Sequence, residues 1–193
     1  MRHLLVTNDY PPKVGGIQSY LWEIYRRLPQ DKVVVYTTPH PDSESFDKQQ
    51  THKIIRSKQR VLLPTKQVAN QIRSVAKDED IDFIMYDPAV PIGMLGPKIR
   101  IPYGVILHGA EVTIPGRVPI ARALIANVLQ NAKLVVTAGD YSTKEAIRAA
   151  KQDLPICVIP PGVDIDRFKP LDEQTRSTAR GRFNFRDDDE VIL

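Results

Sequence analysis

The chain has 193 residues, of which 42% are hydrophobic and 26% charged, and its formal net charge is +4 at pH 7. These values fit one folded domain with a fragment of a second, and they exclude a disordered or fibrous protein. The only cysteine, Cys157, excludes an internal disulfide and a cysteine-based metal cage. No apolar run is long enough for a membrane span or a signal peptide, so we expect a cytoplasmic location.

The chain begins with the pattern of a strand, a glycine loop and a helix. The apolar run His3–Thr7 is followed by Asn8 and Asp9, and two glycines stand at positions 15 and 16. Apolar residues then recur from Ile17 to position 28 at the spacing of one helix face, and a proline ends that stripe.

Five later apolar runs are continuous, as in strands that are buried on both faces. They occupy residues 33–37, 83–86, 105–107, 134–137 and 157–159. Helical patterns lie between several of them, at 67–77, 119–131 and 142–151, and Ser142 and Glu145 have the spacing of a capping box. This alternation predicts an α/β fold with a Rossmann-like, doubly wound parallel sheet.

The tail has a different character. A polar helical stretch covers 172–183, and the chain ends on the apolar residues 191–193. We expect residues 1–170 to form one domain and residues 171–193 to form a hinge and the cut-off start of another. A last edge strand of the same sheet is the alternative.

Ligands bind beyond the carboxyl ends of the strands in such a sheet. Gly15 and Gly16 precede a helix whose first N–H groups and positive dipole end suit a phosphate or carboxylate. Taken alone, two glycines before a helix more often form a tight turn, which is the alternative. The spacing is neither GxGxxG nor that of a P-loop, so an NAD enzyme and a P-loop ATPase are not supported.

A second candidate, His108, follows the strand that ends at residue 107. A histidine there can bond a substrate hydroxyl or transfer a proton, and a loop histidine bonded to the backbone is the alternative. Asp9 and Glu111 are the carboxylates best placed for the same cleft, whereas capping explains the polar residues 137–142. The four histidines lack the spacing of metal ligands, so we expect no metal.

Three motifs, VTNDYPPKVGGIQSYLWEI, ILHGAEV and VIPPGVDIDRFKP, occur in this order. They resemble the amino-terminal half of retaining GT-B glycosyltransferases of family 4, and most of all the phosphatidylinositol mannosyltransferases. The resemblance implies a glycosyltransferase that transfers mannose from GDP-mannose, with retention and without a metal, to a lipid-linked acceptor such as phosphatidylinositol mannoside. It also implies that 1–170 is the acceptor-side domain and that 171–193 leads into a donor-binding domain, without which the chain is inactive.

The resemblance assigns roles to single residues. Gly15, Gly16 and Ile17 line the donor diphosphate, and His108 contacts the transferred sugar. Three polar residues are acceptor-side or loop-ordering, namely Asp9, Gln18 and Glu111. Near relatives carry HGHE where this chain has HGAE, so the resemblance does not fix the sugar or the acceptor.

The segment 48–77 contains eight lysines and arginines and no acidic residue. With the apolar residues 61–63 it can lie on anionic lipid headgroups. We therefore expect peripheral contact with the inner face of the cell membrane, through Lys53, Arg56, Lys58, Arg60, Lys66 and Arg73. The alternative is a solvated face balanced by acids elsewhere. No Phe, Trp or Tyr lies in the segment, so nucleic acid is not an expected partner.

Two other functions stay open at this point. The chain can be a non-catalytic module that binds a lipid or a sugar phosphate, or a GT-B glycosyltransferase that uses another nucleotide sugar.

Overall fold

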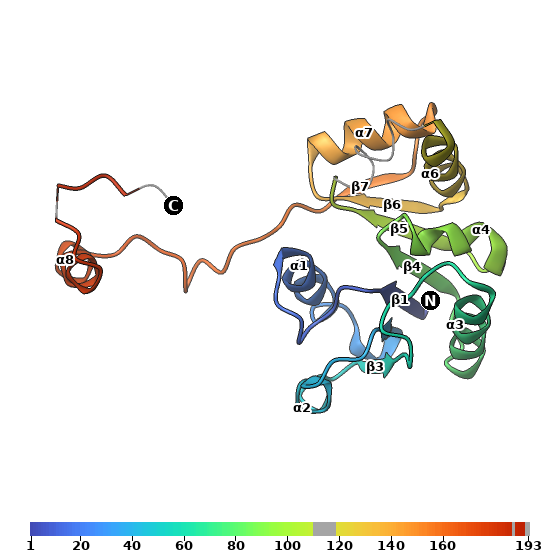
Figure 1. Ribbon diagram of the computed structural model, residues 1–193, viewed down its shortest axis with the longest axis horizontal. Helices are drawn as coiled ribbons and strands as arrows, with labels where there is room; N and C mark the ends of the chain where they lie inside the picture. The colour runs from blue at the N-terminus through green and yellow to red at the C-terminus, as the bar shows by residue number, and fades with distance from the viewer. Residues whose placement is uncertain (110–118, 187, 192–193) are drawn as a thin grey trace. The chain divides into compact units, whose positions relative to one another are not determined.

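The structure, a computed structural model, describes residues 1–109, 119–186 and 188–191. The chain divides into two compact units, Met1–Pro161 and Gly162–Leu193 (Figure 1). The predicted boundary at residue 170 lies inside the second unit. The candidate site belongs to the first unit.

The first unit is built on a seven-stranded parallel sheet in the order β3-β2-β1-β4-β5-β6-β7. The strands are β1 (His3–Thr7), β2 (Val33–Thr37), β3 (Lys53–Arg56), β4 (Phe83–Asp87), β5 (Tyr103–Leu107), β6 (Leu134–Thr137) and β7 (Ile156–Val158). This arrangement confirms the predicted α/β, doubly wound fold. The chain builds outwards from β1 to β3 and then returns to the other side of β1 at β4, so β1 and β4 flank the topological switch point.

Helices cover both faces of the sheet (Figure 1). The helix α1 (Gly16–Tyr25) lies on one face, and the short α2 (Ser43–Asp47) follows β2. The opposite face carries α3 (Lys66–Asp78), α4 (Gly96–Ile99), α6 (Pro119–Asn131) and α7 (Asp140–Ala150). Two 3-10 turns, Gln30–Lys32 and Ile92–Leu95, precede β2 and α4.

Each central strand contributes side chains to two cores. In β1, Leu4 packs in the cluster beneath α3, whereas Leu5 packs in the cluster beneath α1, and both are fully buried. Neighbouring side chains of a strand point to opposite faces, so a strand covered on both faces must be apolar throughout. This burial explains the continuous apolar runs of the central strands. The prediction is wrong for the run 157–159, because β7 is an edge strand in which Cys157 and Val158 are exposed.

Two helix starts differ from the sequence pattern. The predicted capping box at Ser142 is wrong, because α7 begins at Asp140 with Gly139 as its N-cap, and the Ser142 hydroxyl donates to the Gly139 carbonyl at 2.9 Å. In α3, Thr65 is the N-cap, and its hydroxyl accepts from the Val68 N–H.

The second unit contains α8 (Glu173–Arg182), which confirms the predicted polar helix. Asp172 caps it by accepting the Thr175 N–H at 2.8 Å. Residues 192 and 193 of the predicted final strand lie outside the described residues, and Val191 is not in a strand. Among the described residues, none of the helices combines the length and apolarity that crossing a membrane requires.

Candidate functional site at the carboxyl edge of the sheet

The candidate site lies where β1 and β4 end side by side. Thr7 and Asp87 are register partners on these strands, and His108 directly follows β5, the next strand along. Because the sheet is parallel, all three positions lie at its carboxyl edge, where the sequence predicted ligand binding.

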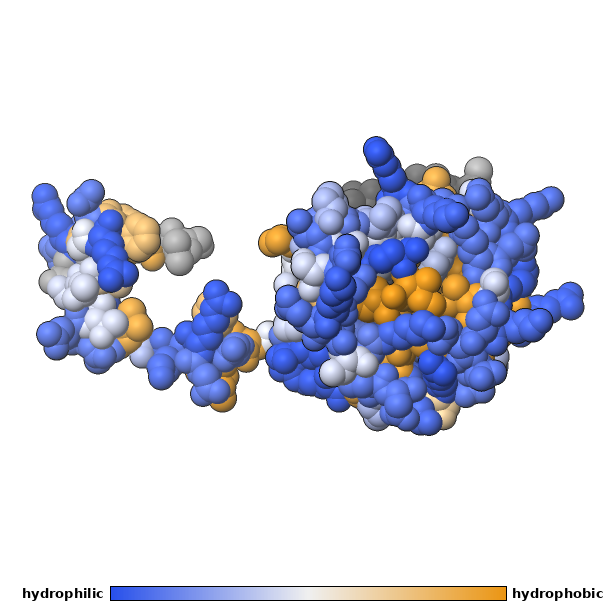
Figure 2. Space-filling view, turned by 90° about the horizontal axis from the view of Figure 1, so that it is seen from below, coloured by the Kyte–Doolittle hydropathy of each residue, from blue (hydrophilic) through white to orange (hydrophobic). Residues whose placement is uncertain are grey.

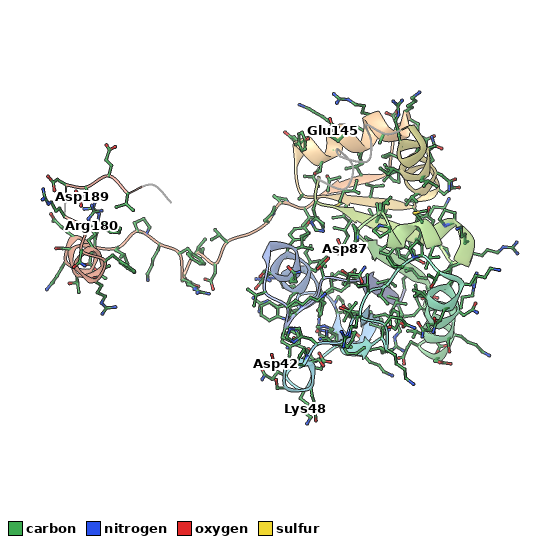
Figure 3. All side chains as sticks on the ribbon, viewed as in Figure 1. Asp42, Lys48, Asp87, Glu145, Arg180 and Asp189 are labelled. Carbon is green, nitrogen blue, oxygen red and sulfur yellow. The ribbon has the colours of Figure 1, made fainter. Side chains whose placement is uncertain are left out.

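A buried carboxylate links these three positions. Asp87 is fully buried, and its Oδ1 lies 2.5 Å from His108 Nε2. Its Oδ2 accepts from the Thr7 hydroxyl at 2.8 Å, and the Thr7 oxygen accepts from the Asp9 N–H at 2.9 Å. Figure 3 labels Asp87 within the first unit. The sequence analysis missed Asp87; the available signal was a carboxylate that closes an otherwise apolar strand.

The His108 ring also packs against α1. Its centroid lies 5.6 Å from that of Tyr20, with the two rings edge to face, and the Tyr20 hydroxyl donates to the Ile159 carbonyl at 2.7 Å. Burial, assisted by the negative charge of Asp87, raises the pKa of Tyr20 to about 12, so the phenol keeps its proton. The imidazole therefore contacts both a carboxylate of the sheet and an aromatic ring of the helix.

The start of α1 has room for a ligand. Gly16 opens the helix, Gly15 is its N-cap, and no side chain caps the first N–H groups. A Cβ atom added to Gly16 would meet no atom within 4 Å, whereas one added to Gly15 would lie 2.2 Å from Gln18 Oε1. Gly16 thus borders open space, and Gly15 lies against Gln18. The exposed Ile17 follows Gly16 in the first turn.

Asp9 and Gln18 come together, because Gln18 Nε2 donates to Asp9 Oδ1 at 2.8 Å. This bond ties the end of β1 to the first turn of α1 and closes the intervening loop. The geometry favours the loop-ordering role over an acceptor-side role, and both stay predictions. Glu111, the third residue of this predicted group, lies outside the described residues.

The loop between β1 and α1 is also held from the side of β3. Arg56 forms a two-pronged ion pair with Asp47, at 2.6 and 3.0 Å, and its side chain is only 14% exposed. The same guanidinium donates to the Pro11 carbonyl at 2.7 Å and to the Thr38 carbonyl at 3.1 Å. This position corrects the expectation that Arg56 faces lipid: the side chain is committed to the protein.

A second buried contact supports the loop at Tyr10. The Tyr10 hydroxyl lies 2.9 Å from His52 Nε2, and Gln30 Oε1 lies 2.8 Å from His52 Nδ1. The Gln30 amide nitrogen donates to the carbonyls of Tyr25 and Leu28, so its oxygen faces the histidine. Therefore Nδ1 carries the imidazole proton, and Nε2 accepts from Tyr10.

The other predicted lipid-facing cations fall into two groups. Lys53 pairs with Glu79, and Arg73 donates to the side chain of Asn70 and to the Lys98 carbonyl. Within the described part of the chain, no ion pair involves the remaining three, and all of them are exposed: Lys58, Arg60 and Lys66.

A metal centre has no visible ligand set in the described ranges. Among those residues, no group of three or more His, Cys, Asp or Glu side chains is arranged so that it could hold an ion. The expected absence of a metal stays a prediction, since residues 110–118, which follow His108 and Gly109 in the sequence, lie outside those ranges.

Replacing Arg56 by Met should lower the free energy of unfolding by about 2 kcal/mol, because it leaves the half-buried Asp47 carboxylate and two carbonyls without their donor. Denaturant titration measures this loss. Arg60→Met is the matched control and should change the free energy by less than about 0.5 kcal/mol, because Arg60 is exposed and unpaired among the described residues. Equal effects of the two substitutions would contradict the role of Arg56.

The stability of the chain should fall as the pH drops below the ordinary histidine pKa of 6.5. Burial lowers the pKa of His52 in the folded state, so the unfolded chain binds the proton first and acid favours unfolding. Thermal unfolding between pH 7.5 and 5.5 measures the slope. His52→Gln should reduce this slope, and the half-buried His3, whose pKa burial also lowers, should account for part of the remainder. Identical slopes would contradict the assignment.

Comparisons with known proteins place this geometry in a family. Residues 14–167 match Glycosyltransferase Family 4. The chain is 30% identical to the GDP-mannose-dependent alpha-(1-6)-phosphatidylinositol monomannoside mannosyltransferase of Mycobacterium tuberculosis, with 99% of the chain and 52% of the relative covered. The enzyme of that name from Mycolicibacterium smegmatis is also 30% identical, with 98% and 51% covered.

Solved structures share the fold. The Anabaena protein HepE in complex with UDP superposes with a TM-score of 0.71 at 18% identity, covering 95% of this chain and 50% of that one. Sucrose-phosphate synthase from Thermosynechococcus elongatus gives 0.68 at 14% identity, covering 97% and 53%. The chain thus spans about half the length of its curated relatives and of these structures. By its sequence match and its fold, it belongs to Glycosyltransferase Family 4.

Proposed function

We propose that this chain is the acceptor-side half of a glycosyltransferase that transfers mannose from GDP-mannose, with retention, to a phosphatidylinositol mannoside lipid. One observation carries the proposal: an open helix start at Gly16 and the Asp87–His108 pair converge on the switch point of the sheet. The donor and acceptor are those named for the mycobacterial relatives.

The chemistry of glycosyl transfer suits this arrangement. The leaving nucleoside diphosphate gains negative charge as its bond to the sugar breaks, and the N–H groups and dipole at Gly16 and Ile17 can stabilise that charge. His108 follows β5, which β4 separates from β1, and its ring packs against Tyr20, which lies one turn after Gly16 on the same helix. Its role in the proposal is to hold the transferred sugar in a reactive pose.

The nucleotide itself needs further contacts. We propose that a second, donor-binding domain supplies them, as the family resemblance implies, and that the 193 residues alone do not transfer sugar. The assays below therefore use the complete protein that the gene encodes.

Transfer of labelled mannose from GDP-mannose to phosphatidylinositol mannoside tests the proposal directly. Gly16→Val should lower the rate about 100-fold or more, because its side chain fills the open space that the diphosphate needs. Gly139→Val is the matched control and should not lower the rate in this way. Gly139 lies at the N-terminus of α7, and a Cβ atom added there also meets nothing within 4 Å. His108→Ala should cause a similar loss, and His40→Ala, a histidine outside the site, should not.

Three outcomes decide between the functions. Transfer that depends on Gly16 and His108 supports the proposal. Faster transfer from a UDP or ADP sugar would replace GDP-mannose by that donor. Binding of donor or lipid without transfer to any acceptor would favour the non-catalytic module.

We also propose that the first unit meets the inner face of the cell membrane through the lipid-contact loop, residues 58–66. Val61 and Leu63 are 55% and 48% exposed in this loop, and Leu62 between them is fully buried. Asn8 fixes the Leu62 backbone, donating to its carbonyl at 3.1 Å and accepting its N–H at 2.7 Å. Figure 2, which views the first unit from the side of β3, shows an apolar area framed by hydrophilic side chains.

The charges of the loop support this proposal. Lys58, Arg60 and Lys66 are exposed and form no ion pair among the described residues, so they can meet anionic headgroups while Val61 and Leu63 enter the interface. Each such cation contributes about 1 kcal/mol near an anionic surface. The proposal therefore no longer needs Arg56, and Lys53 and Arg73 already have partners in the protein.

Sedimentation with vesicles tests the membrane proposal. Replacing Lys58, Arg60 and Lys66 by Gln should weaken binding to phosphatidylcholine vesicles containing phosphatidylinositol by about 100-fold. The control replaces Arg26, Arg27 and Lys48, which pair with Glu23 and Glu44, and it removes the same charge. Equal losses in the two triple variants would indicate an effect of net charge alone. No binding by the unaltered protein would overturn the proposal.

A further inference from the structure

We propose that Asp87 is a positioning residue that fixes His108 in one tautomer and one orientation. The inference deepens the proposed function and rests on it for its catalytic meaning. Among the described residues, the Asp87 carboxylate contacts the side chains of His108 and Thr7.

The Asp87 carboxylate needs a hydrogen-bond donor at each oxygen. It is fully buried, and a buried carboxylate is stable only when donors or cations meet its oxygens. Thr7 has one hydroxyl hydrogen, and its oxygen is already the acceptor for the Asp9 N–H, so that hydrogen goes to Asp87 Oδ2. The other oxygen, Oδ1, then takes its hydrogen bond from His108.

The bond to Asp87 determines the tautomer of the His108 imidazole. Because Asp87 Oδ1 is an acceptor 2.5 Å from His108 Nε2, that nitrogen carries a proton. In the neutral ring Nδ1 is then the acceptor nitrogen. The edge-to-face contact with Tyr20 also restrains the ring, so we infer that neighbouring groups set both its tautomer and its orientation.

The central strands of the sheet hold the Asp87 side chain in place. Asp87 and Thr7 are register partners on two central strands that are buried on both faces. Side chains anchored on such strands have less freedom than those on loops. Asp87 therefore restricts the motion of the His108 side chain, although His108 itself lies beyond the end of β5.

Nitrogen-15 NMR of the 193-residue chain with labelled histidine tests the tautomer. We expect His108 to be protonated at Nε2 in the unaltered chain, with a strongly downfield Nε2–H proton. In Asp87→Asn the side-chain amide can donate to the ring, so that proton signal should disappear and protonation should move toward Nδ1. Asp47→Asn, which alters the carboxylate partnered by Arg56, is the matched control and should leave the His108 signals unchanged.

Kinetics of the complete protein test the functional link. Asp87→Asn should lower kcat by about 100-fold or more, and the loss should vanish when His108 is already Ala, because Asp87 acts through that ring. Thr7→Val should lower kcat by a smaller factor, and Thr7→Ser, which keeps the hydroxyl, should keep kcat near that of the unaltered protein. Thermal unfolding of each variant verifies that the protein is folded.

The outcomes separate the two proposals. An Nδ1–H ring in the unaltered chain, or unchanged His108 signals in Asp87→Asn, would overturn the positioning role. A further large loss from Asp87→Asn in the His108→Ala background would overturn it as well. If no sugar is transferred by the unaltered protein, the proposed function fails, while the NMR result still decides whether Asp87 positions His108.

Discussion

A buried carboxylate determines how the carboxyl edge of this sheet is arranged. Asp87 cannot remain in an apolar interior without donors, so its burial requires a hydroxyl from β1 and a ring nitrogen from beyond β5. Thr7 in turn orients the backbone of Asp9, where the loop toward α1 begins. One unfavourable burial thus connects three strand ends and the start of the glycine loop.

The rest of the site depends on keeping that loop in place. Gln18 of α1 holds the loop at Asp9, and Arg56 of β3 holds it at the Pro11 carbonyl. The loop that leads to the open space at Gly16 is therefore fixed by two contacts. Pre-organised donors stabilise developing charge best when they do not have to move. These polar contacts therefore fix the geometry of the carboxyl edge, and the Arg56–Asp47 pair also contributes to stability.

Much of this could be predicted from the sequence, because burial on both faces makes each central strand a continuous apolar run. The runs in β1, β2 and β4 to β6 arise in this way and, with the alternation of helices, led to the correct fold. The run in β7 also indicated a strand, but this strand lies at the edge of the sheet and is not buried on both faces. The edge strand β3 was missed because only Ile54 and Ile55 in it are apolar, between two cations. His108 was found because it directly follows an apolar run, a position that the parallel topology brings to the ligand-binding edge.

Asp87 was missed and Arg56 was misassigned for the same reason: the role of each depends on a partner in space that the sequence pattern does not reveal. Whether Arg56 faces lipid depends on Asp47, which lies just outside the basic segment in sequence but beside it in space. Asp87 likewise closes an apolar strand, and only the pairing of β1 with β4 reveals why a carboxylate is tolerated there. A crystal structure of the complete protein with a non-transferable GDP-mannose analogue would test the proposed site most directly. We expect the diphosphate at the Gly16 and Ile17 amides and the sugar against His108. A diphosphate bound away from the start of α1 would overturn the proposed site.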